Sequence, residues 1–131
     1  MADHILTKGF KATTGKAYIR GQVVQMTAAW TVDVATAGTQ ILVGVCIEDV
    51  DQVKVDTGKV IIGVDVVGIT RCIASAAIVA GARVTAATGG KIVTMTAAAA
   101  FPTVNCLGIA MGAATANNDE IDVLLTPGAR F

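Results

Sequence analysis

Short apolar segments separated by glycine-rich turns run through almost the whole chain. Residues 30–34 and 53–56 alternate apolar and polar side chains, which is typical of β-strands with one face in water. Residues 60–69 form a nearly continuous β-branched run, which predicts a strand covered on both faces. Gly63 and Gly68 within this run predict bends. The pattern favours a mainly β protein.

The strand pattern occurs twice. The first copy, about residues 21–56, begins at Gly21 and continues through the apolar segment 42–47 to residues 53–56. The second copy, about residues 81–125, begins at Gly81 and continues through segments 90–93, 106–111 and 121–125. Such blocks indicate a small β-barrel or sandwich of short antiparallel strands with at most short helical turns. We expect an extended N-terminal arm over residues 1–20, followed by a single β-rich domain over residues 21–131.

Turn residues and alanine-rich segments complete the predicted secondary structure. Residues 56–59 are predicted as a hairpin turn between the strand at 53–55 and the run at 60–69. Residues 88–91 are predicted as a second hairpin turn. Helix is expected only at residues 75–80, and at residues 97–100 before Pro102.

Composition points to a surface that is suited to being covered. The chain has 131 residues, enough for one domain, with 53% hydrophobic residues, 15% charged residues and a formal net charge of zero. Little charge protects such a surface from self-association or from a docked partner, although a well-filled core of alanine and valine is an equal explanation. The balanced charge argues against nucleic acid as a partner. No secretory signal or membrane span is recognised, so we expect synthesis in the cytoplasm.

Residues for catalysis are scarce. His4 is the only histidine and Ser75 the only serine, so a hydrolytic triad is hard to assemble. Cys46, Cys72 and Cys106 lack CxxC spacing and are expected to be buried, reduced thiols. The sequence therefore predicts a protein that is not an enzyme and that has no cofactor.

The carboxylates allow two weaker hypotheses. Glu48, Asp49 and Asp51 lack the spacing and the glycine of an EF-hand, so no metal is expected. Asp65, inside the apolar run, is expected to be paired or to point outward, with Arg71 as one partner. These two residues would carry an enzyme site shared between subunits if the chain were a small oligomeric β-barrel enzyme.

The order of the strand blocks resembles that of small capsid decoration proteins, also called cement or head-stabilising proteins, of tailed bacteriophages. The resemblance covers about residues 20–125 and is carried by residues 81–84, 90–93, 107–110 and 119–125, preceded by the shorter version at 21–55. The insertion at residues 97–102 and the first 20 residues depart from the pattern.

This resemblance implies a structural virion protein that binds the exterior of the mature phage capsid and stabilises the shell. Its partner would be the major capsid protein. It would form a homotrimer, or a dimer as the alternative, without nucleic acid or membrane. A tail or head-completion component, or the base of a fibre, remains the alternative function.

The N-terminal arm is the predicted capsid-binding segment, because an extended arm can add a strand to an exposed sheet edge. The apolar anchors would be Phe10, Tyr18 and Ile19. Steering by charge would come from Lys8, Lys11 and Lys16. A second candidate contact is the C-terminus, with Arg130 and Phe131. An end that is disordered or packed within the chain is an equal explanation for both segments.

Overall fold

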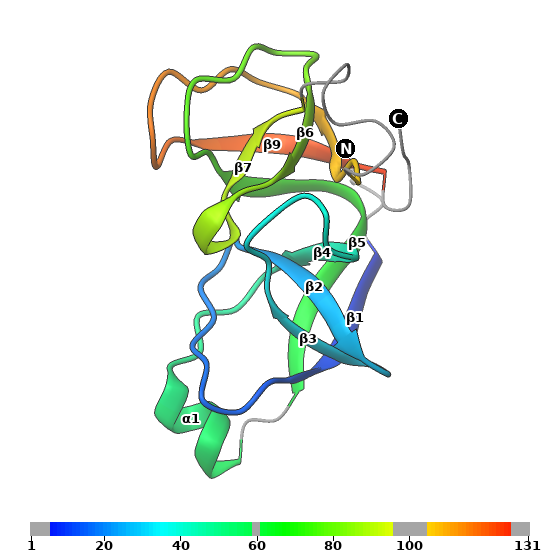
Figure 1. Ribbon diagram of the computed structural model, residues 1–131, viewed down its shortest axis with the longest axis vertical. Helices are drawn as coiled ribbons and strands as arrows, with labels where there is room; N and C mark the ends of the chain where they lie inside the picture. Colours follow the sequence, from blue (N-terminus) through cyan, green and yellow to red (C-terminus); the bar gives the residue numbers. More distant parts are fainter. Residues whose placement is uncertain (1–5, 59–60, 96–104, 127–131) are drawn as a thin grey trace.

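One long strand, β5 (Ile61–Ile73), runs through the molecule and belongs to two groups of strands (Figure 1). The computed structural model describes residues 6–58, 61–95 and 105–126. The first half of β5 pairs with β1 and β4, and its second half pairs with β9. The pairing partner of β5 changes at Gly68, where φ is 110°, a backbone conformation that glycine adopts at little cost. This agrees with the bend predicted at Gly68. The predicted mainly β fold is confirmed, and the run at 60–69 is a strand as predicted. Within the chain, however, only one face of this strand is fully covered: Ile62 and Val64 are buried, whereas Ile61 and Val67 on the other face are about half exposed.

The first group of strands is a closed five-stranded barrel. Its order is β1, β3, β2, β4 and β5, and β5 pairs back to β1. All of these pairs are antiparallel except β1 with β3, which is parallel. Closure leaves the barrel without long free edges. The bounds of these strands are β1 (Leu6–Ala12), β2 (Val23–Ala28), β3 (Thr31–Val34) and β4 (Leu42–Cys46).

The second group repeats this arrangement. From β5 the order continues through β9, β8, β6 and β7, all antiparallel. A parallel bridge between Ala74 and Ile92 then joins β7 to the segment that follows β5, as the parallel pair joins β3 to β1 in the first barrel. The bounds are β6 (Arg83–Ala86), β7 (Ile92–Thr94), β8 (Gly108–Ala110) and β9 (Glu120–Leu125).

Matching hydrogen bonds relate the two groups residue by residue. The N–H of Gly21 donates to the carbonyl of Cys46, and the N–H of Gly81 donates to that of Ala110, both at 2.8 Å. Both glycines have φ near +90° and occupy equivalent turns. The repeat in the amino-acid pattern thus corresponds to a repeat in three dimensions.

A second pair of glycines allows the closest strand contacts. Gly44 in β4 lies against β5, and Gly108 in β8 lies against β9. A Cβ at Gly44 would overlap the backbone oxygen of Asp65, and one at Gly108 would overlap that of Leu124. Glycine is therefore required at the same place in both groups.

Buried residues on both faces of a strand explain the apolar runs. Val23 and Val24 are adjacent in β2, point to opposite faces, and are both fully buried. Val24 packs in the core of the first barrel, whereas Val23 packs in a second core that continues into the other group of strands. Strand β2 therefore lies between the two cores.

The strand predicted at residues 53–56 is wrong. These residues lie in helix α1 (Gln52–Thr57), because the Asp51 side chain accepts a hydrogen bond from the N–H of Lys54 at 2.8 Å and starts the helix. Gly58, with φ of 146°, ends it, so no hairpin turn forms at residues 56–58. Val55 is 1% exposed whereas Val53 is 69% exposed, so the apolar–polar alternation of this segment does not correspond to one buried strand face.

The helix predicted at residues 75–80 is also wrong. The N–H of Ser75 donates to the carbonyl of Ile92, and Ile78 pairs with Ala114, so tertiary hydrogen bonds take the place of helical ones. The turn predicted at 88–91 is confirmed as a 3₁₀ turn, Thr88–Gly90, between β6 and β7. The helix predicted at 97–100 lies outside the described residues. In the described part of the chain, no helix is long and apolar enough to cross a membrane.

Alanine at either close-packed glycine should destabilise the fold by about 2 kcal/mol or more, because the new Cβ would push two strands apart. The free energy of unfolding in urea for Gly44→Ala and Gly108→Ala measures this. Gly112→Ala is the matched control, since nothing lies within 4 Å of its Cβ position. Equal stability of all three variants would contradict the close approach.

Alkaline pH should destabilise the protein through Cys72, which, like Cys46 and Cys106, is buried and unbridged. Burial raises the pKa of the Cys72 thiol from 9.0 to about 12. The unfolded chain then ionises first, so stability is full below about pH 9 and falls by up to about 4 kcal/mol as pH rises to 12. Urea unfolding across this range should show a smaller fall for Cys72→Ala, and an unchanged fall would contradict the assignment.

Candidate functional site

The segment predicted as an arm is part of the first barrel over residues 6–20. Strand β1 lies in the barrel wall, and Phe10 fills the barrel core. Tyr18 is also buried; its hydroxyl donates to the carbonyl of Val32 at 3.0 Å and accepts from the N–H of Thr13 at 2.8 Å. Burial raises the pKa of this phenol. These described residues differ from an extended free arm because Phe10 and Tyr18 supply core contacts.

The remaining predicted contact residues lie on the surface. Lys8, Lys11, Lys16 and Ile19 are exposed. The structure therefore offers these four side chains, rather than Phe10 and Tyr18, to a partner. Their docking role stays a prediction. Residues 1–5, Arg130 and Phe131 lie outside the described residues.

The structure does not bring Asp65 and Arg71 into one site within the chain. Asp65 is buried and accepts a hydrogen bond from the hydroxyl of Thr7 at 2.6 Å. Arg71 is exposed, and its Nε lies 3.5 Å from Oδ1 of Asp122 on the neighbouring strand. The described residues contain no group of three or more His, Cys, Asp or Glu that could hold a metal ion.

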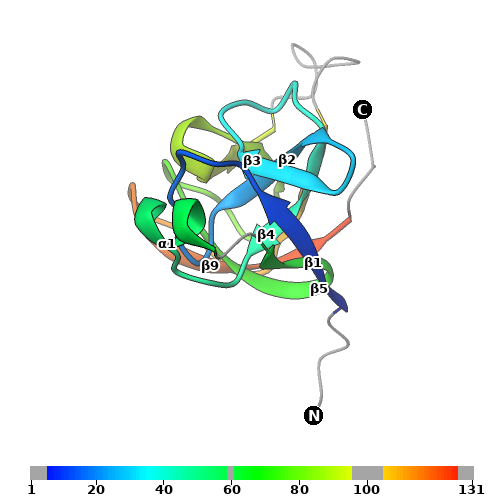
Figure 2. The same ribbon diagram turned by 90° about the horizontal axis from the view of Figure 1, so that it is seen from below.

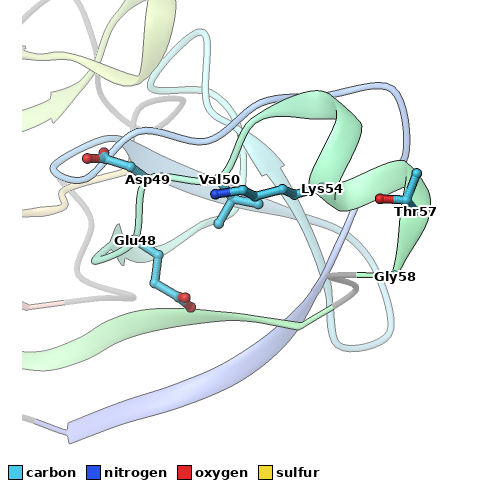
Figure 3. A pocket seen from close by; sticks show the side chains of 6 residues that line it. All are labelled: Glu48, Asp49, Val50, Lys54, Thr57 and Gly58. Atoms are coloured by element: carbon cyan, nitrogen blue, oxygen red, sulfur yellow. The ribbon is translucent and has the colours of Figure 1, made fainter.

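An open pocket of about 470 Å³ lies beside α1 (Figure 3). Two of the acidic residues considered in the sequence, Glu48 and Asp49, line it together with Val50, Lys54, Thr57 and Gly58. Oε2 of Glu48 accepts from the N–H of Gly63 at 2.6 Å, which fixes the loop against β5. The cap residues Asp51 and Gly58 are the sequence signal that could have predicted α1 and, with it, this pocket.

Trp30, which the alternating pattern of residues 30–34 places in a strand, is instead a feature of the surface. It lies in the turn between β2 and β3, is 60% exposed, and has φ of 55°. Its ring lies 5.4 Å from that of Phe10, and its carbonyl accepts from the N–H of Lys11 at 2.7 Å. A bulky residue in the left-handed region is uncommon and costs free energy. Nothing in the hydrophobic pattern reveals this backbone conformation.

Comparison with known proteins adds evidence on the fold. No protein-family model matches the chain, and no curated protein matches it. Among solved structures, the chain is similar to the head fiber gp8.5 N base of bacteriophage phi29, with a TM-score of 0.65 and 16% sequence identity. The match covers 93% of this chain and 94% of that chain. At this identity the two proteins share a fold, over nearly the full length of both.

Proposed function

We propose that the chain is a structural protein of a bacteriophage virion and forms the base of an appendage on the outside of the head. The observation that carries this proposal is the shared fold with a head fiber base over 93% of this chain and 94% of the other. Agreement over such coverage includes both groups of strands, so the whole architecture is shared and not one common barrel.

The fibre-base role is now preferred over the decoration role. Both were expected from the sequence, with the decoration protein first and the fibre base as its alternative. The structural neighbour supports the alternative, because its printed description is that of a fibre base. A capsid-stabilising role remains compatible with the fold and would differ in the number of copies on each particle.

The architecture suits a part that transmits force. Strand β5 is hydrogen-bonded in both groups of strands, so the chain has no flexible linker between them. A base of this kind would dock on the major capsid protein or another exposed head protein and form a homo-oligomer, with the trimer preferred. The exposed Lys8, Lys11, Lys16 and Ile19 are the proposed contact residues.

Purified particles from the source of this chain test the proposal by quantitative mass spectrometry. We expect the chain on intact heads, in far fewer copies than the major capsid protein, and accessible to an antibody from outside. Empty heads that lack DNA are the matched sample, because a protein attached to the outside should be present on them as well. Absence from particles would contradict the proposal, and one copy or more per capsid lattice site would favour the decoration role instead.

A further inference from the structure

The repeat also relates the turns of the two hairpins. The hairpins β2–β3 and β6–β7 have the same length, because the residue pairs 26–32 and 86–92 close them. Trp30 in the first turn therefore corresponds to Gly90 in the second, and both have a positive φ, of 55° and 73°. The contacts of Gly90 within the chain thus show where an equivalent turn docks.

The turn of the second hairpin joins the two groups of strands. The N–H of Gly90 donates to the carbonyl of Ala35 at 2.8 Å, and the carbonyl of Gly89 accepts from Nε2 of Gln22 at 3.1 Å. A Cβ at Gly90 would lie 2.9 Å from Cβ of Gln22 and from Cγ1 of Val34. The turn therefore packs on residues just before β2 and at the end of β3, where only glycine fits.

The second group carries an equivalent surface just before β6 and at the end of β7. Ala82 corresponds to Gln22, because each follows the glycine of an equivalent turn. Thr94 corresponds to Val34, because β6 pairs with β7 in the register in which β2 pairs with β3. Thr94 is exposed, and Val79, whose carbonyl accepts from the N–H of Ala82, is 75% exposed. This surface is therefore accessible.

The sizes of the side chains are exchanged between the two places. Within the chain, the long side chain of Gln22 faces Gly90, which has no side chain. At the equivalent positions Ala82 is small and Trp30 is large. Trp30 is also 60% exposed, even though its ring contacts Phe10. A large residue on the turn thus matches a small residue on the surface that such a turn contacts.

We propose that the β2–β3 turn of one copy docks through Trp30 on the surface formed by Val79, Ala82 and Thr94 of a second copy of this chain. The partner is a second copy because the equivalents of these two surfaces already meet between the two groups of one chain. Val79 and Ala82 supply apolar area to the indole. Tryptophan is among the residue types most enriched as anchors of protein interfaces.

The contact is head-to-tail. Figure 1 shows the β2–β3 hairpin in the lower group of strands and β6 in the upper group, so Trp30 does not reach Ala82 of its own chain. Helix α1 lies on a different side of the first barrel from this hairpin in both views (Figures 1 and 2), so it does not cover the turn. Two different surfaces on one chain form a heterologous interface, which closes into a ring when the rotation between copies permits. This inference concerns self-assembly and does not rest on the proposed function.

Fluorescence tests the contact directly, because Trp30 is the one tryptophan of the chain. The emission of an indole shifts to shorter wavelength when the ring leaves water. We expect this shift as the concentration of the wild type is raised, over the range in which sedimentation equilibrium shows association. Association without any shift, or a wild type that stays monomeric, would overturn the inference.

Two variants test the two sides of the interface. Trp30→Gly removes the indole and suits the positive φ. Ala82→Gln introduces the residue that stands at the equivalent place in the first group, so it should fold but leave no room for the indole. We expect each variant to weaken self-association by about 30-fold or more. A mixture of the two should form a 1:1 complex, because one variant keeps the surface and the other keeps the indole.

Ala116→Gln is the matched control, because it makes the same substitution at an exposed alanine in the turn before β9. It should associate like the wild type. Thermal unfolding verifies that each variant is folded, and Trp30→Asn replaces Trp30→Gly if the latter is not, since asparagine tolerates this backbone. Wild-type association of Ala82→Gln, no complex in the mixture, or equal weakening by Ala116→Gln would each contradict the proposed contact.

The two proposals fail in different ways. A chain found on phage heads but monomeric in solution would overturn only the interface. A chain that assembles through Trp30 but is absent from particles would overturn only the proposed function.

Discussion

Hydrogen bonding of one strand in two groups is the constraint on which the rest of the structure depends. The first half of β5 closes the five-stranded barrel, and its second half pairs along its length with β9. Gly68 allows the strand to turn from one group to the other. Because neither group is complete without β5, neither can form its full set of strand pairs alone. Strand β2 also links the two groups, because Val23 packs in the core on one of its faces and Val24 packs in the core on the other.

The fold class and the repeat follow from features that the sequence displays openly. Glycines at equivalent turns, such as Gly21 and Gly81, mark places where the backbone itself demands glycine, so they recur at a fixed spacing. The β-branched run that becomes β5 is visible because β-branched residues recur along it, although Ile61 and Val67 on one of its faces remain about half exposed. These signals are local in the sequence and survive without knowledge of the tertiary contacts.

One misassigned segment carries a local signal in its caps, and the others depend on contacts between distant residues. Residues 53–56 alternate like a strand, and only the Asp51 cap shows that they are helical. From the sequence alone, Phe10 and Tyr18 are as suitable for exposed anchors as for core residues, and only the pairing of β1 with β5 shows that this segment is part of the barrel. Trp30 fits a strand pattern as well as a turn, and its positive φ is a property of the hairpin. The pocket beside α1 and the unusual backbone of Trp30 therefore became visible only in three dimensions.

A shared strand makes the two groups one cooperative unit, and this is the property that suits a rigid base. Differential scanning calorimetry tests it most directly, by comparing the calorimetric enthalpy of unfolding with the van't Hoff enthalpy. A single transition in which the two enthalpies agree is the result expected if β5 couples the groups. Two resolved transitions, or a calorimetric enthalpy about twice the van't Hoff value, would show that the groups unfold independently and would contradict this account.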